Sequence, residues 1–165
     1  MNEAAKETVL RHFTYGLYAV TVKREGDEHG ITANWVSQAS FEPPMVVVAV
    51  ESRSKIIELI RDAHHFAINV FHEGQRDLAE KLGRAGAGAS QKLKGIKTKP
   101  TPASGAPVLA DALGWVECRV VATLPSGDHT LVLGEVVEGG VEHEGVRSEE
   151  RRVRKECRSR WSPYH

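Results

Sequence analysis

Residues 30–55 constrain the fold of this 165-residue chain more than any other stretch. They read GITANWVSQASFEPP, then the apolar run MVVVAV, and then ESRSK. The apolar run has the length of a strand and no polar alternation, which predicts a strand covered on both faces at the centre of the core. A small-polar and cationic cluster follows, at the start of a short apolar helical pattern. Hydroxyls, cations and a helix N-terminus together are suited to bind a phosphate group.

The rest of the chain divides into short elements with turn residues between them. Helices are predicted over residues 3–15, from an N-cap at Ser54, and over residues 75–82. Further strands are predicted over residues 17–23, 31–36, 65–71, 115–124 and 130–137. The glycine- and alanine-rich residues 83–94 predict a mobile loop. About six strands, joined mostly by tight turns, favour a mainly β fold, an antiparallel barrel with short peripheral helices.

The charge balance and the N-terminus exclude several classes of protein. The chain has 22 basic and 22 acidic residues, which leaves no net field to attract nucleic acid or an anionic membrane surface. Its first residues are acidic where a signal peptide is basic, and no apolar run approaches the roughly 18 residues of a membrane span. We therefore predict a cytoplasmic protein with no nucleic-acid or membrane partner.

Sequence motifs for metal binding or nucleophilic catalysis are missing. The two cysteines lack a CxxC spacing, and His64, His65 and His72 lack the neighbours of a zinc site. The glycine-rich residues 83–88 lack both a preceding strand and the GK[ST] of a phosphate-binding loop. No metal site is predicted, and Cys118 is interpreted as a buried thiol.

Residues 147–165 differ in composition from the rest of the chain. They carry seven basic and three acidic residues, and they resemble the conceptual translation of a common DNA sequencing adapter. We interpret them as a non-native disordered tail rather than a nucleic-acid-binding arm. The native domain is then expected to occupy residues 1–146, without its C-terminal end.

Several motifs follow one another from about residue 14 to residue 137. They are FTYGLYAVTV, HGITANWVSQASFEPPMVVVAVESRSK, ELIRDAHHFAINVF, DLAEKLG, GAPVLADALGWVECRV and GDHTLVLGEVV. In this order they resemble the flavin reductase-like family of flavin-binding split β-barrels, which includes the flavoredoxins. The resemblance implies an antiparallel split barrel and a homodimer that holds FMN, or in some members FAD, near the subunit interface. NADH or NADPH is the usual electron source of the family.

The resemblance also assigns roles to individual residues. One family segment runs along the isoalloxazine ring and ribityl chain and would hydrogen-bond the polar edge of the ring. In this chain it comprises Thr32, Ala33, Asn34 and Trp35. Ser37 and Gln38 would bind the ribityl chain or the phosphate. The phosphate-binding turn comprises Ser52, Arg53, Ser54 and Lys55. The alternatives are an ordinary strand for the first segment and a helix N-cap with solvated cations for the turn.

His129 is the candidate catalytic residue. It lies in GDHTLVLGEVV, where the family places a histidine close to the flavin. The imidazole would hydrogen-bond the cofactor or the nicotinamide, and a plain turn histidine is the alternative. The family reaction needs no protein nucleophile or base, because hydride passes directly from nicotinamide C4 to flavin N5 when the two rings stack.

The resemblance predicts an FMN-dependent flavin reductase that transfers electrons from NADH or NADPH to bound or free flavin. A monooxygenase or another electron-transfer protein would be its partner. The first alternative is a flavoredoxin-type electron carrier reduced by a protein donor. The second is a flavin-binding module without turnover, since a fold alone does not prescribe an activity.

Overall fold

The computed structural model describes residues 1–84 and 91–147, which form three helices and nine strands. The helices are α1 (Glu3–Arg11), α2 (Lys55–Ala63) and α3 (Arg76–Gly83). The strands are β1 (Tyr18–Arg24), β2 (Asp27–Ala33), β3 (Val36–Ser40), β4 (Met45–Glu51), β5 (His65–Val70), β6 (Thr98–Pro100), β7 (Pro107–Leu109), β8 (Gly114–Ser126) and β9 (His129–Val141). The prediction of a mainly β fold with short peripheral helices is confirmed.

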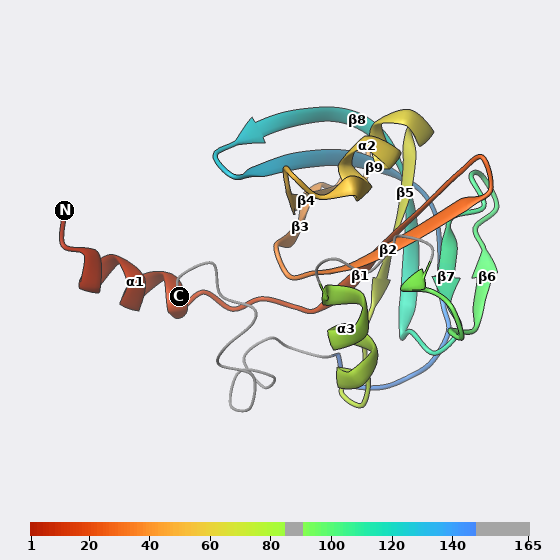
Figure 1. Ribbon diagram of the computed structural model, residues 1–165, viewed down its shortest axis with the longest axis horizontal. Coiled ribbons are helices and arrows are strands. Elements are labelled where there is room, and N and C mark those ends of the chain that lie inside the picture. The colour runs from red at the N-terminus through yellow and green to blue at the C-terminus, as the bar shows by residue number, and fades with distance from the viewer. Residues whose placement is uncertain (85–90, 148–165) are drawn as a thin grey trace.

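Seven of the strands form one sheet, in the order β2-β1-β5-β8-β9-β4-β3. Every neighbouring pair in it is antiparallel. The edge strands β2 and β3 are consecutive in the chain and are joined only by Asn34 and Trp35. The sheet therefore curls until its two edges meet at this connection, which gives the open barrel seen in Figure 1.

The inside of the curled sheet holds the main hydrophobic core. Alternate residues of β1, Val20 and Val22, point into it and are fully buried. Three residues on one face of α2, Ile56, Ile57 and Ile60, enter the same cluster. Because apolar residues at this spacing share one side of a helix, α2 covers one end of the barrel.

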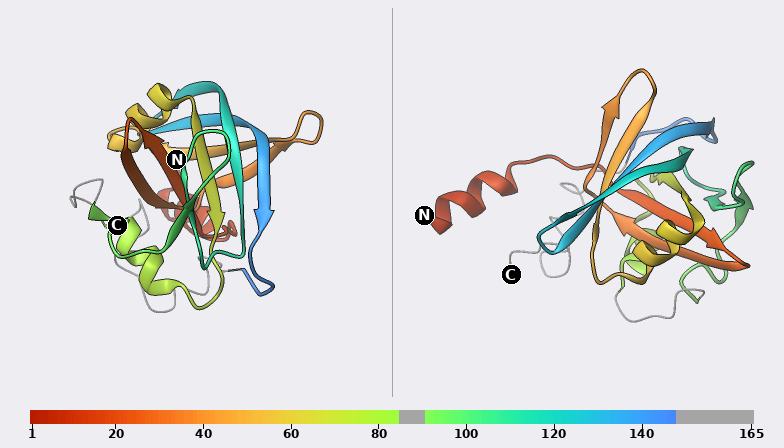
Figure 2. Two further views of the ribbon diagram at one scale, coloured as in Figure 1. Left: turned by 90° about the vertical axis from the view of Figure 1, so that its right-hand side faces the viewer. Right: turned by 90° about the horizontal axis from the view of Figure 1, so that it is seen from above.

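A second core lies outside the sheet, where α3 and the β6–β7 hairpin pack against it. Figure 2 shows these elements on the outside of the sheet. Leu82 of α3 and Leu109 of β7 are buried in it. The Thr21 hydroxyl donates to the Pro107 carbonyl over 2.6 Å, and the Asn69 side-chain oxygen accepts from the Leu109 amide over 2.9 Å. Buried hydrogen bonds as well as apolar contacts therefore hold the hairpin on the sheet.

Strand β4 does not lie at the centre of the core, and the prediction for residues 45–50 was wrong in this respect. It is next to the edge strand β3, and only Val48 and Val50 among its residues are buried. Its first residues pair with β3 in a hairpin that projects from the body (Figure 2). One face of β4 lines the barrel while the other is partly exposed, which an unbroken apolar run does not reveal.

Helix α1 ends at Arg11 instead of residue 15. Residues 12–16 read HFTYG, and aromatic, β-branched and glycine residues are weak helix formers. No residue of α1 is buried, and the helix projects away from the barrel in Figure 1. Val9 and Phe13, four residues apart, are therefore exposed in the single chain.

More strands form than the sequence predicts. The strand predicted over residues 31–36 divides into β2 and β3, with a break at Asn34 and Trp35. The strands β6 and β7 have three residues each, too few to show a period in the sequence.

Two predictions fall largely outside the described residues. Residues 85–90 of the predicted mobile loop and residues 148–165 of the predicted tail are not among them. Arg147 is described and forms an isolated antiparallel bridge with His72. The domain boundary at residue 146 stays a prediction. Neither described part, 1–84 or 91–147, contains a helix long and apolar enough to cross a membrane.

Gly134 in β9 lies where the inner face of the barrel is most crowded. A Cβ atom at this position would lie 2.7 Å from Phe66 Cζ and 2.8 Å from Cys118 Cβ, closer than carbon atoms pack. We expect Gly134→Val to lower the free energy of unfolding by about 2 kcal/mol, measured by urea denaturation. The matched control is Ala122→Val at an exposed position of β8. Equal stability of the two variants would contradict this packing.

Candidate functional site

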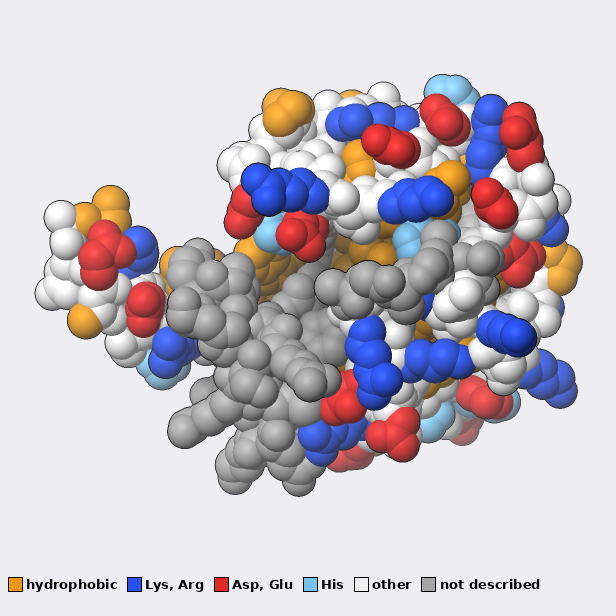
Figure 3. Space-filling model, viewed as in Figure 1, with side chains coloured by type: hydrophobic (Ala, Val, Ile, Leu, Met, Phe, Trp, Pro, Cys, Tyr) orange, Lys and Arg blue, Asp and Glu red, His pale blue; other side chains and the backbone are white. Residues whose placement is uncertain are grey.

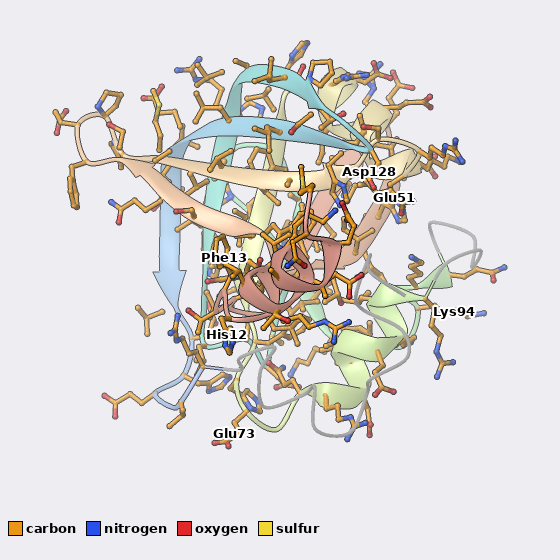
Figure 4. All side chains as sticks on the ribbon, turned by 90° about the vertical axis from the view of Figure 1, so that its left-hand side faces the viewer. His12, Phe13, Glu51, Glu73, Lys94 and Asp128 are labelled. Carbon is orange, nitrogen blue, oxygen red and sulfur yellow. The ribbon has the colours of Figure 1, made fainter. Side chains whose placement is uncertain are left out.

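Three segments that are distant in sequence meet at one end of strands β4 and β9. Ser52 follows β4, His129 begins β9, and Trp35 connects β2 to β3. Glu51 pairs with His129 across the β4–β9 ladder, and Figure 4 shows the Glu51 and Asp128 side chains close to each other. The structure thus brings together Trp35, Ser52 and His129, one residue from each predicted part of the site.

Ser52 contacts the residues on both sides of His129. Its backbone N–H donates to the Asp128 carbonyl over 2.9 Å. Its hydroxyl lies 2.9 Å from the Thr130 hydroxyl. The turn after β4 and the start of β9 are therefore one connected unit.

The His129 ring packs against an aromatic pair. Its centroid lies 4.7 Å from that of Trp35 at an interplanar angle of 41°, and Trp35 lies 6.2 Å from Tyr15. These separations are typical of interacting aromatic rings. The result is an apolar wall beside a polar turn, as in many small-molecule sites. On the face shown in Figure 3 the surface is hollowed near the middle, with hydrophobic side chains exposed inside the hollow.

A carboxylate holds the His129 ring at one nitrogen. His129 Nδ1 lies 2.6 Å from Asp128 Oδ1. The hydrogen bond, together with the attraction of the imidazole charge, lowers the pKa of the Asp128 carboxyl. A carboxylate can only accept, so the bond requires the proton on Nδ1. Among the described residues, the other ring nitrogen, Nε2, has no hydrogen-bond partner.

The predicted phosphate-binding turn lies at the N-terminus of α2. Ser54 has the extended backbone of an N-cap, but its hydroxyl makes no capping hydrogen bond, so the prediction of a side-chain cap was wrong. Among the described residues, the Ser54 hydroxyl and the Lys55 N–H have no hydrogen-bond partner, whereas the Ile57 N–H already donates to the Ser54 carbonyl over 3.1 Å. Arg53 and Lys55 are exposed, and neither forms an ion pair with another described residue. Within the part of the chain that the structure describes, the turn thus offers the Ser54 hydroxyl, the Lys55 N–H and two cations without ion-pair partners.

In the predicted flavin-binding segment, residues 32–35, some groups already bond or pack within the protein. The Thr32 hydroxyl donates to the Ala79 carbonyl in α3 over 2.6 Å. Ala33 is buried and pairs with Tyr18 of β1. Asn34 follows and begins the connection to β3. The Trp35 side chain, at the end of this segment, contacts the His129 ring.

Ser37 and Gln38 do not join the cluster. They are exposed on β3, where their side chains bond to the nearby carbonyls of Gln38 and Ser40. Gln38 pairs with Val46, six residues before Ser52. At about 3.3 Å per residue, that separation is roughly 20 Å along the hairpin.

Sequence reasoning missed three residues of the cluster. Asp128 and Thr130 flank His129 in the motif GDHT and bond to His129 and Ser52, respectively. Their position beside a candidate histidine was the available signal. Tyr15 lies before β1, and nothing in the sequence relates it to Trp35.

The described residues show no site for metal or thiol chemistry. Within residues 1–84 and 91–147, no group of three or more His, Cys, Asp and Glu side chains could hold a metal ion. Cys118 is fully buried, as predicted, and burial raises the pKa of its thiol to about 12. Cys118 is therefore a packing residue, because an inaccessible and protonated thiol is a poor nucleophile.

Comparison with known proteins gives matches along most of the chain. A family model described as flavin reductase like domain matches residues 10–154. The reductase component of 4-hydroxyphenylacetate 3-monooxygenase from Thermus thermophilus is 32% identical over 145 residues, which cover 88% of this chain and 89% of that protein. Diflavin flavoprotein A 1 of Synechocystis sp. is 35% identical over 137 residues, which cover 82% of this chain and 24% of that protein. The chain thus spans about a quarter of the length of the diflavin flavoproteins it matches.

A solved structure gives a similar result. The NADH:FAD oxidoreductase of Streptomyces globisporus C-1027, in complex with NAD and FAD fragments, superposes with a TM-score of 0.77 at 26% sequence identity. The superposition covers 90% of this chain and 86% of that chain.

Proposed function

Because this chain belongs to the flavin reductase-like domain family, we propose that it binds FMN, or FAD, and reduces it with NADH or NADPH. One observation carries the proposal: the turn suited to bind a phosphate is directly bonded to the segment that bears the His129 imidazole. Ser52, at the head of that turn, bonds to both neighbours of His129. A flavin needs these two features together, because its phosphate and its redox-active ring are parts of one molecule.

The turn at the start of α2 fits the anionic end of a flavin nucleotide. Ser54 supplies an open hydroxyl, and the helix N-terminus adds partial positive charge. Arg53 and Lys55 supply full charges that no described carboxylate neutralises. This donor set matches a phosphate better than a neutral ligand.

Trp35 and His129 fit the ring end of the cofactor. When bound, the flavin would accept electrons from the nicotinamide and pass them on. Trp35 offers a flat apolar surface, while Asn34 and the backbone of Thr32 and Ala33 offer polar groups to the ring edge. His129 Nε2 would hydrogen-bond the flavin or the nicotinamide. Ser37 and Gln38 lie too far along β3 to reach a phosphate bound at the turn. We propose that they would contact the ribityl chain only if the β3–β4 hairpin bends toward the turn.

Relatives support a partner for the reduced flavin. The Thermus thermophilus relative is, by its name, the reductase component of 4-hydroxyphenylacetate 3-monooxygenase. We therefore propose that this chain supplies reduced flavin to a monooxygenase. A second candidate, an electron carrier, is favoured by the similarity to diflavin flavoproteins, of which the matched region is only a part. There the flavin would stay bound and receive electrons from a protein donor.

Exposed apolar residues support the proposal of a homodimer. Phe13 in the segment after α1 is 56% exposed, and Leu124 near the β8–β9 turn is 61% exposed. Projecting segments with large exposed apolar side chains are typical of protein interfaces. Sedimentation equilibrium of the chain and of the Phe13→Glu, Leu124→Glu double variant tests the dimer. A monomeric wild-type chain would contradict it.

Anaerobic reduction of the flavin-loaded chain tests the activity. NADH or NADPH should bleach the flavin absorbance within seconds, and excess free FMN should then be reduced catalytically. Dithionite serves as the control for a reducible flavin. A bound flavin that dithionite bleaches and neither nicotinamide bleaches would reject the reductase and favour the carrier.

A further inference from the structure

We propose that Tyr15 is a positioning residue that holds the Trp35 ring in place and thereby raises the affinity of the site for the flavin ring. The identity of the ligand rests on the proposed function. The dependence of the Trp35 orientation on Tyr15 concerns the protein alone and can be measured without a ligand or turnover.

Tyr15 lies where the N-terminal segment first meets the barrel. Residues 11–14 are exposed, whereas Tyr15 is half-buried and Leu17 is buried. Figure 1 shows this segment running from the projecting helix α1 to the start of β1. The Leu17 carbonyl accepts from the Phe71 amide over 3.3 Å, which ties the chain to the end of β5 two residues after Tyr15. Tyr15 is therefore anchored to the barrel, although α1 is not.

The Trp35 ring contacts two other rings from distant parts of the chain. Its centroid lies 6.2 Å from that of Tyr15 at an interplanar angle of 50°, and 4.7 Å from that of His129 at 41°. Both separations lie in the range of about 4.5–7 Å over which tilted aromatic rings attract each other. Trp35 nevertheless stays only half-buried, so part of its ring surface remains accessible to a ligand.

The backbone of Trp35 is fixed, but its side chain depends on these ring contacts. The Trp35 carbonyl accepts from the Ala49 amide of β4 over 2.9 Å. Trp35 belongs to the two-residue connection between β2 and β3 and not to a strand. Replacing Tyr15 by an aliphatic residue removes one of the two ring contacts that the described residues give it. A ligand that uses the Trp35 surface must then immobilise the side chain itself, which weakens binding.

Nitrogen-15 relaxation of the tryptophan indole groups in the full, ligand-free chain tests the orientation. The sequence has three tryptophans, and Trp35→Phe identifies the indole signal of Trp35. Tyr15→Leu should lower the order parameter of that indole from about 0.85, typical of a rigid group, to below about 0.6. Tyr15→Phe, which keeps the ring, should preserve it. Phe41→Leu changes an aromatic side chain that is 86% exposed and is the matched control. An equal order parameter in wild type and Tyr15→Leu would overturn the proposal.

Riboflavin binding separates positioning from direct contact with the ligand. Riboflavin lacks the phosphate, so Tyr15→Leu should raise the Kd for riboflavin and for FMN by the same factor, about fivefold for one side chain that binding must immobilise. Tyr15→Phe should restore the affinity. In a Trp35→Leu background, Tyr15→Leu should have no further effect. A further loss in that background would overturn the positioning role, whereas a wild-type chain that binds neither riboflavin nor FMN would reject only the proposed function.

Discussion

Replacing Arg53 and Lys55 together by alanine is expected to raise the Kd for FMN about a hundredfold. Both cations are exposed at the head of α2 and have no ion-pair partner among the described residues. A charge-assisted hydrogen bond to phosphate contributes about 1.5 kcal/mol or more, and solvent screening at an exposed site keeps each contribution near the low end. About 1.4 kcal/mol per cation corresponds to tenfold in Kd for each.

Riboflavin provides the sharpest comparison for this prediction. It carries the same ring and ribityl chain as FMN without the phosphate, so its affinity should be equal in wild type and in Arg53→Ala, Lys55→Ala. Titration by quenching of flavin fluorescence measures both ligands. Arg61→Ala with Lys97→Ala removes two exposed cations elsewhere and is the control. If FMN and riboflavin lose affinity equally, the turn does not bind the phosphate.

Glu117→Ala is expected to lower the free energy of unfolding by about 3 kcal/mol. Glu117 is fully buried in β8, and its carboxylate binds the loop between β6 and β7. It accepts from the Thr101 hydroxyl over 2.7 Å and from the backbone amides of Ala103 and Ser104 over 3.0 and 2.8 Å. The Ser104 hydroxyl is a fourth donor. Removing the carboxylate leaves these donors without an acceptor and releases the loop from the sheet.

The same carboxylate makes stability depend on pH. Burial alone raises the pKa of Glu117, but the hydrogen bonds from Ser104, Thr101 and Ala103 outweigh it and lower the pKa overall. The folded state therefore holds the proton less tightly than the unfolded chain, in which a glutamate has a pKa of about 4.3. The contribution of Glu117 is fully present above that pH and is lost as the pH falls through the lowered pKa.

Thermal and urea unfolding of Glu117→Ala and wild type, at pH 7 and at pH 3, measure both effects. At pH 7 the midpoint temperature of the variant should be lower by roughly 10 °C. The difference between the two proteins should shrink at pH 3. Glu144→Ala, at an exposed glutamate, is the control and should match wild type at both pH values. A difference that grows on acidification would contradict the lowered pKa.

Periodicity and turn residues predicted the parts of the fold that depend on local sequence. The apolar helical pattern after Ser54 is α2, whose isoleucines enter the core, and the β-rich residues 17–23 and 130–137 lie mostly in β1 and β9. The position of β4 in the sheet was not predictable in this way. A strand order depends on pairing between distant segments, and the apolar side chains of β4 are compatible with both a central and a penultimate place.

In the candidate site, too, some residues could be predicted from the sequence and others could not. Ser52, Trp35 and His129 were predicted from family motifs, and the structure brings them into one cluster. Asp128 was not predicted: the sequence shows that it is next to His129, but only the structure shows its carboxylate within hydrogen-bond distance of the ring. Glu117 was also missed. A glutamate in a strand is normally solvated, and only the β6–β7 loop, folded over it, supplies the donors that make its burial favourable.

The most direct test of the account is a titration of the full chain with FMN, followed by flavin fluorescence and by the phosphorus-31 resonance of the ligand. We predict saturable quenching of the flavin, together with a shifted phosphorus resonance that returns toward the free position in Arg53→Ala, Lys55→Ala. Unchanged flavin fluorescence and an unshifted phosphorus resonance, with FAD failing in the same way, would contradict the claim that this barrel holds a flavin nucleotide at the start of α2.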